Sequence, residues 1–184
     1  IGFPYHSYID TRDSLEALVG SFVPLVKHAA SRAAYILCGP TQIGLYPQPI
    51  WCLAITWNTT GTFGKYGYNQ WTPVLCYGPD IKGFGNVNGT TKTDTLRISG
   101  GGGVGFARTP IEKEHTCPKP ITVMDLVIQR LTNQPEIILD PFCGSGTTCV
   151  AAKKLGRRWI GIDIEPKYVE IAKSRVMNTE RPLF

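Results

Sequence analysis

The chain has 184 residues, 42% of them hydrophobic and 18% charged, against about 25% charged residues in ordinary soluble domains. This composition excludes disordered and fibrous proteins, and the longest apolar runs fall far short of the roughly 20 residues that a membrane-spanning helix requires. We therefore expect a soluble protein with one domain over residues 1–184, and its formal net charge of +5 permits a polyanionic partner.

The cysteines and the start of the chain bear on its location and completeness. None of the six cysteines belongs to a C-x-x-C pair, so free thiols and no metal site are expected. No secretion signal opens the chain, which predicts a cytoplasmic protein. The first residue is Ile1, and the run that follows is typical of the middle of a chain, so we expect a missing N-terminal piece.

The first half of the chain is predicted to hold a helix and three strands. Apolar residues recur every three or four positions over 13–26, which indicates an amphipathic helix. Asp13 and Glu16 fit a capping box, and Pro24 should kink or shorten the helix. Short apolar runs at 34–38, 51–57 and 72–77 predict buried strands.

Residues 81–110 differ in composition from the rest of the chain. They contain eight glycines, four basic residues and one acid, which predicts a long, flexible, basic insertion. Such an insertion is either a solvated surface loop or a segment that follows a phosphate backbone, and both interpretations stay open.

After Pro120 helices and strands alternate regularly. The pattern predicts helices over 120–132, 147–155 and 166–177 and strands over 136–140 and 158–164, with Gly156 ending the second helix. This alternation is typical of an α/β fold with a doubly wound, mostly parallel sheet.

A glycine-rich turn follows the strand at 136–140 and leads into a helix. Gly144 and Gly146 let the backbone approach a ligand, and the helix start offers free N–H groups. Asp163 ends the next predicted strand, where parallel α/β proteins place a carboxylate that accepts ribose hydroxyls. Cys149 breaks the dinucleotide fingerprint and no G-K-[ST] occurs, so a nucleoside ligand other than NAD or ATP is favoured.

A family resemblance rests on the runs Asp140-Pro-Phe-Cys-Gly-Ser-Gly-Thr-Thr148, Gly161-Ile-Asp-Ile-Glu-Pro-Lys-Tyr168, Ile171-Ala-Lys-Ser-Arg175 and Glu114-His-Thr-Cys-Pro-Lys-Pro120. They resemble motifs of the S-adenosylmethionine-dependent DNA amino-methyltransferases, and their order resembles the circularly permuted β group. The resemblance implies a Rossmann-like sheet, incomplete at its N-terminus. It also implies methyl transfer to adenine N6 or cytosine N4 of a flipped base in double-stranded DNA, a reaction used in restriction–modification.

The same resemblance implies roles at a cofactor site. Asp140 would hold the methionine amino group, Asp163 would accept the ribose hydroxyls, and Phe142 would line the cofactor. Lys119 would lie near the cofactor, order the preceding loop, or simply be a solvated side chain before a helix. The residues implied to bind S-adenosylmethionine are Lys119, Asp140, Pro141, Phe142, Cys143, Gly144, Gly146, Thr147, Asp163 and Ile164.

The catalytic motif of the family, Asp/Asn/Ser-Pro-Pro-Tyr/Phe, has one partial match, which includes Pro4 and Tyr5. Gly2 stands where that motif has its acceptor and has no side chain to accept a hydrogen bond. We therefore expect the true motif upstream of Ile1, in a missing segment or a partner subunit. The alternative is a truncated or degenerate, non-catalytic module that binds cofactor or DNA.

Basic residues supply the candidates for DNA binding. By position, residues 81–110 would form the target-recognition region of the family. Lys65 and the neighbouring aromatic rings either stack on a displaced base or pack as ordinary strand and loop residues. The DNA-binding candidates are Lys65, Lys82, Lys92, Arg97 and Arg108.

Overall fold

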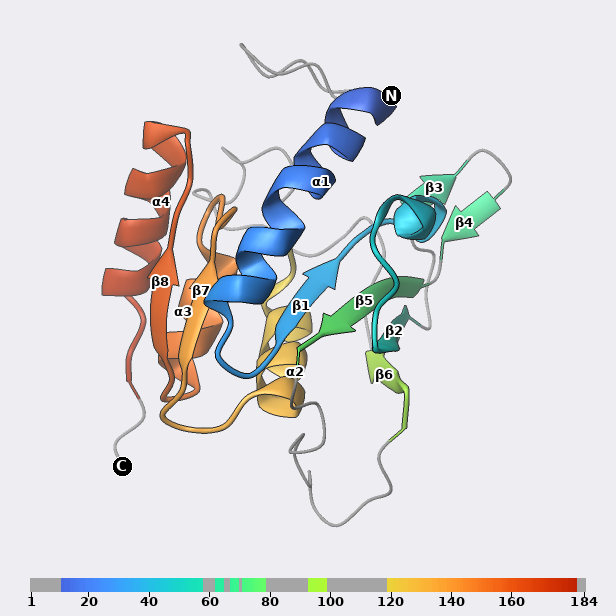
Figure 1. Ribbon diagram of the computed structural model, residues 1–184. Coiled ribbons are helices and arrows are strands. Elements are labelled where there is room, and N and C mark those ends of the chain that lie inside the picture. Colours follow the sequence, from blue (N-terminus) through green and yellow to red (C-terminus); the bar gives the residue numbers. More distant parts are fainter. Residues whose placement is uncertain are drawn as a thin grey trace. The chain divides into compact units, whose positions relative to one another are not determined.

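The chain divides into two units, which are described separately. The computed structural model describes residues 11–57, 62–64, 67–69, 71–78, 93–98 and 119–181 (Figure 1). The first unit holds one long helix and the strands up to residue 97, and the second holds residue 98 and the described part from 119 onward. The prediction of one domain over 1–184 stays a prediction.

The first unit begins with helix α1 (Arg12–Ala29). Its N-cap is Thr11, whose hydroxyl accepts from the Ser14 N–H at 3.2 Å while the Ser14 hydroxyl accepts from the Thr11 N–H at 3.0 Å. The predicted capping box at Asp13 is therefore wrong, because Thr11 already supplies the first acceptor. Of the two effects expected of Pro24, shortening is wrong, because the helix runs five residues further, with Val23 buried just before the proline. A kink at Pro24 stays a prediction.

A four-stranded sheet packs against this helix, in the order β1-β5-β2-β6. Strand β5 pairs antiparallel with both neighbours, Ile36 lying opposite Leu75 and Leu53 opposite Val74. The three predicted strands are confirmed, whereas β6 lies inside the predicted insertion and was missed. The elements after α1 are β1 (Ala34–Leu37), the 3-10 helix η1 (Pro40–Leu45), β2 (Trp51–Trp57), β3 (Thr62–Gly64), β4 (Gly67–Asn69), β5 (Trp71–Tyr77) and β6 (Thr95–Ile98), of which only Ile98 is assigned to the second unit.

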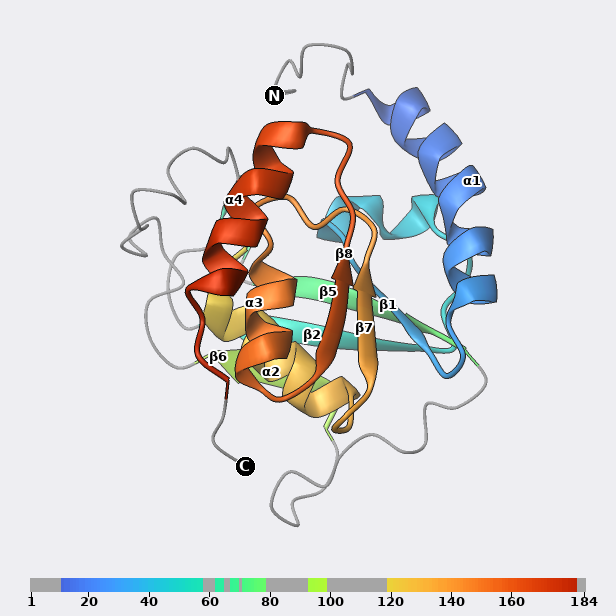
Figure 2. The same ribbon diagram turned by 90° about the vertical axis from the view of Figure 1, so that its left-hand side faces the viewer.

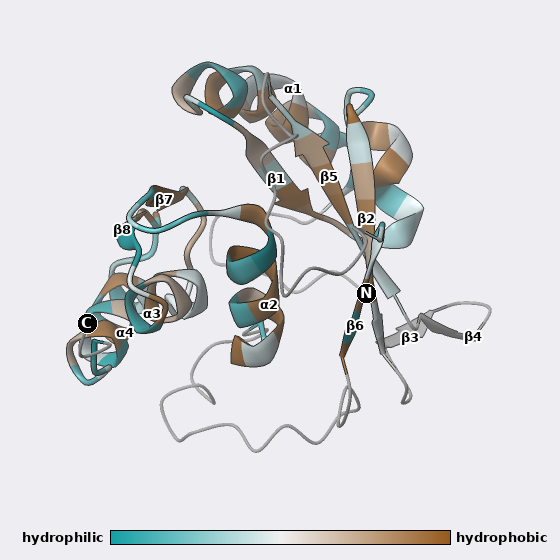
Figure 3. Cartoon of the chain, turned by 90° about the horizontal axis from the view of Figure 1, so that it is seen from below, coloured by the Kyte–Doolittle hydropathy of each residue, from teal (hydrophilic) through white to brown (hydrophobic). Residues whose placement is uncertain are grey.

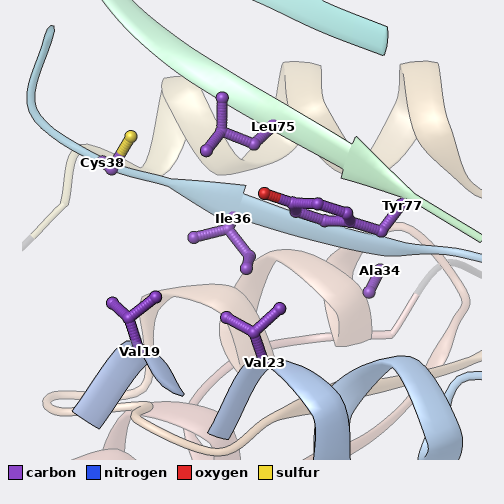
Figure 4. Close-up of a cluster of buried hydrophobic side chains, with 7 residues drawn as sticks. All are labelled: Val19, Val23, Ala34, Ile36, Cys38, Leu75 and Tyr77. Atoms are coloured by element: carbon purple, nitrogen blue, oxygen red, sulfur yellow. The ribbon is translucent and has the colours of Figure 1, made fainter. Parts of the chain in front are cut away.

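A cluster of buried apolar side chains joins α1 to the sheet (Figure 4). Val19 and Val23 point from the helix toward Ile36 of β1. Tyr77 is buried, and its hydroxyl donates to the Pro47 carbonyl at 2.7 Å, so its polar end is satisfied. The hydropathy colouring shows the same apolar character along β1 and β5 (Figure 3).

The second unit contains a βαβ arrangement. Strands β7 and β8 pair in parallel, with Leu139 opposite Ile160, and α3 connects them, as Figure 2 shows. The predicted parallel pairing is thereby confirmed after Pro120, while the strands of the first unit pair antiparallel. The bounds are α2 (Ile121–Leu131), β7 (Ile137–Asp140), α3 (Thr147–Lys154), β8 (Arg158–Gly161) and α4 (Pro166–Met177).

Three helices build the interior of this unit. Helix α2 contributes more buried residues than α3 or α4, and the last of them, Leu131, is fully buried. Helix α3 adds Ala151 and Ala152, and α4 adds Tyr168 and Ile171. None of the helices in the described part of the chain is long and apolar enough to cross a membrane.

Candidate functional site

The glycine-rich turn joins the end of β7 to the start of α3. Within it the Gly146 N–H donates to the Cys143 carbonyl at 2.8 Å, and the Cys143 N–H donates to the Ile162 carbonyl at 2.9 Å. Gly144 and Gly146 have φ angles of 51° and 77°, a left-handed conformation that favours glycine. The turn is thus tied to the residues that follow β8, at the carboxyl ends of both parallel strands.

Two carboxylates flank this turn. Asp140 accepts a hydrogen bond from the Phe142 N–H at 3.1 Å. Asp163 accepts one from the Gly144 N–H at 2.8 Å and a second from the Glu165 N–H at 2.9 Å. The structure therefore brings together the turn and the distant acid that the sequence singled out, and Asp163 also braces the turn.

Apolar side chains stand exposed beside the carboxylates. Phe142 is 56% exposed in the turn, and Ile164 is 99% exposed directly after Asp163. Exposed apolar groups next to partly exposed carboxylates can contact a ligand that combines a flat ring with positively charged or hydroxyl groups.

The other side of the turn is held by α4. Arg175 Nη1 donates to the Ser145 carbonyl at 2.6 Å, to the Ser145 hydroxyl at 3.0 Å and to the Thr147 hydroxyl at 3.1 Å. Ser145 and Thr147 are only 2% and 4% exposed. The Thr147 side chain thus lies behind the turn, and only its backbone is available to a ligand. Sequence reasoning gave Arg175 no role, because nothing in its spacing marks the contact.

Two thiols lie behind the turn. A Cβ on Gly161 would lie 2.7 Å from Cys149 Sγ and 3.1 Å from Cys143 Sγ, so the two sulfur atoms are neighbours. Burial, with a smaller effect of Asp140 and Asp163, raises the pKa of Cys143 to about 11. Burial, with the neighbouring Cys143, raises the pKa of Cys149 to about 12. Both thiols are protonated at neutral pH, which makes them poor nucleophiles.

The other predicted site residues lie at exposed positions or outside the described part of the chain. Lys119 is exposed two residues before α2, and Arg97 is exposed in β6. Within the described residues, no group of three or more His, Cys, Asp or Glu is placed to hold a metal ion. The candidates Pro4, Tyr5, Lys65, Lys82, Lys92 and Arg108 lie outside the described residues.

Comparisons with known proteins agree with this geometry. The sequence model of the N6/N4 methyltransferase family, described as DNA methylase, matches residues 40–174. The chain belongs to this family. The chain also resembles the crystal structure of M1.HpyAVI in complex with SAM, with a TM-score of 0.69 and 25% identity over 92% of this chain and 84% of that one. The predicted α/β fold is thereby confirmed.

Curated relatives match a shorter segment of the chain. The type II methyltransferase M2.LlaDCHI of Lactococcus lactis subsp. cremoris is 49% identical over 63 residues, which cover 34% of this chain and 23% of that protein. M2.DpnII of Streptococcus pneumoniae is also 49% identical over 63 residues, which cover 34% of this chain and 24% of that protein. The matched segment thus spans about a quarter of either relative.

Proposed function

We propose that the glycine turn binds S-adenosylmethionine, and that the protein is part of an enzyme that methylates DNA. The substrate would be an exocyclic amino group, adenine N6 or cytosine N4, in double-stranded DNA. The observation that carries this proposal is the hydrogen bond from the Gly144 N–H to Asp163, which sets a carboxylate beside a left-handed glycine turn. Membership of the DNA methylase family supports it.

The residues present fit this cofactor chemically. S-adenosylmethionine carries an ammonium group and two ribose hydroxyls, which can donate hydrogen bonds to carboxylates such as Asp140 and Asp163. The positive charge of its sulfonium group is also attracted to a nearby carboxylate. Its adenine ring suits the exposed apolar surface of Phe142 and Ile164. When bound, S-adenosylmethionine supplies an electrophilic methyl group on its sulfonium sulfur.

The chain's own residues would hold and orient that cofactor. Methyl transfer further requires an acceptor that turns the lone pair of the amino nitrogen toward the methyl group. In this proposal a segment or partner subunit not contained in the 184 residues supplies that acceptor, and Pro4 and Tyr5 are loop residues after it or a remnant of the catalytic motif. The motif order is that of the circularly permuted β group. A non-catalytic module that binds the cofactor at the same turn is the second candidate, since Gly2 lacks an acceptor.

Replacing Asp163 by alanine is expected to weaken S-adenosylmethionine binding by about 1–3 kcal/mol, because ribose hydroxyls lose their acceptor. Isothermal titration of the 184-residue chain measures this loss. Glu165→Ala is the matched control: it removes an exposed carboxylate two residues away that makes no side-chain cap on α4.

A second comparison separates ribose recognition from bracing of the turn. Wild type should bind S-adenosylmethionine more tightly than its 2′,3′-dideoxy analogue, and Asp163→Ala should bind the two alike. Equal discrimination by wild type and variant would show that Asp163 does not accept the ribose hydroxyls, even if both affinities fall.

Replacing Lys92, Arg97 and Arg108 by glutamine in one variant is expected to reduce the salt dependence of DNA binding. Each phosphate that the variant no longer neutralises should reduce the slope of log affinity against log salt by about 0.9. Filter binding to one duplex at several salt concentrations measures this slope. The control neutralises Arg12, Lys167 and Lys173, which are exposed on α1 and α4. An unaltered slope in the first variant would remove residues 92–108 from the interface.

A further inference from the structure

Helix α4 carries two residues, one helical turn apart, that both contact the glycine turn. A Cβ on Gly146 would lie 2.6 Å from Ala172 Cβ and 2.9 Å from its Cα, so the turn rests directly on Ala172. Three positions later, Arg175 Nη1 reaches the Ser145 carbonyl and the hydroxyls of Ser145 and Thr147. Residues at i and i+3 share one helix face. That face of α4 therefore supports the turn.

The contacts of Arg175 fix a particular peptide group. The carbonyl of Ser145 accepts from Arg175 Nη1 at 2.6 Å, while the N–H of the same peptide, on Gly146, donates to the Cys143 carbonyl at 2.8 Å. This peptide is held at both ends and leads into the left-handed Gly146. On the opposite side, Asp163 holds the Gly144 N–H.

The helix dipoles do not decide why a guanidinium stands here, because Arg175 lies in the last turn of α4, where the dipole favours a cation, but contacts the start of α3. The turn ends at Gly146, the N-cap of α3, and the positive end of a helix dipole disfavours a nearby cation. All three contacts come from Nη1, which belongs to a planar, preorganised guanidinium, whereas a lysine ammonium is a compact charge at the end of a flexible stem.

We propose that Arg175 is a positioning residue for the cofactor: it sets the conformation of residues 144–147 from behind. This inference rests on the proposed function, because it takes S-adenosylmethionine as the ligand of the turn. Arg175 would act through Ser145 and Thr147, whose side chains are buried.

The chain offers a matched control for a merely structural role. Lys153 on α3 donates to the Val176 carbonyl on α4 at 2.7 Å, so it also joins these two helices. This hydrogen bond runs from helix to helix and does not involve the turn. Lys153→Ala thus weakens helix packing in the same place without removing a donor from residues 144–147.

The test compares Arg175→Ala, Arg175→Lys and Lys153→Ala with wild type in the 184-residue chain. Titration with S-adenosylmethionine should show an affinity about tenfold lower for Arg175→Ala, intermediate for Arg175→Lys and unchanged for Lys153→Ala. Millimolar methylguanidinium should restore part of the affinity of Arg175→Ala only. Amide hydrogen exchange at Gly146 should accelerate in Arg175→Ala and not in Lys153→Ala.

The outcomes separate this inference from the proposed function. If wild type binds S-adenosylmethionine and a folded Arg175→Ala binds it with the same affinity, only the role of Arg175 is overturned. The same conclusion follows if Lys153→Ala loses as much affinity as Arg175→Ala. A wild-type chain that does not bind S-adenosylmethionine overturns the proposed function and the inference with it. If Arg175→Ala does not fold, Arg175→Lys decides, and wild-type affinity in that variant overturns the inference.

Discussion

Gly146→Ala is expected to destabilise the second unit by about 2–5 kcal/mol and to weaken S-adenosylmethionine binding. The backbone there has φ 77°, which costs a residue with a Cβ about 1–2 kcal/mol. The new methyl group would also lie 2.6 Å from Ala172 Cβ, so α4 or the turn must shift, at a cost of about 1–3 kcal/mol. Urea unfolding followed by circular dichroism measures the loss.

Gly20→Ala is the control for this substitution. Gly20 lies inside α1, and a Cβ there meets no heavy atom within 4 Å. Alanine should therefore raise helix stability by about 0.5–1 kcal/mol. The free energy of unfolding is expected to fall in Gly146→Ala and to rise in Gly20→Ala. A Gly146→Ala protein as stable as wild type would contradict the left-handed conformation of the turn.

The second large effect is expected for Leu53→Ala in the first unit. Leu53 is 0% exposed in the centre of the sheet, where β2 lies between β5 and β6. Truncation of such a side chain leaves a cavity and costs about 2–5 kcal/mol. The midpoint of urea unfolding should fall accordingly.

The same substitution at Leu25 provides the comparison. Leu25 is 69% exposed on α1, and Leu25→Ala should change stability by less than about 0.5 kcal/mol. Equal losses for Leu53→Ala and Leu25→Ala would show that β2 is not an interior strand.

The second half of the fold could be predicted because local signals there agree with one another. The bounds of α4 were predicted to the residue, since Pro166 at the first helical position suits a helix start. The strand before the glycine turn was likewise placed within one residue of β7. Strand β8, by contrast, ends at Gly161, three residues before the predicted end, because Asp163 turns to accept backbone N–H groups.

Other features depend on contacts that sequence spacing does not encode. Strand β6 is four residues long within a glycine-rich basic segment, and it exists because β2 offers an edge to pair with. Pro24 does not end α1, because burial of Val19 and Val23 holds the helix on the sheet. At the site, the approach of Gly144 to Asp163 was predictable from the parallel βαβ pattern, whereas the reach of Arg175 across to Ser145 was not.

The thiols of Cys143 and Cys149 restrict which residues position 161 can hold. Gly161 has no room for a methyl group, because the sulfur atoms of Cys143 and Cys149 already occupy the space. A larger residue at 161 therefore requires the Cys149 side chain to move, and a smaller residue at position 149 should remove that requirement. Substitutions at Gly161, Cys143 and Cys149 are therefore expected to be energetically coupled, so that the cost of one depends on the residues at the other two.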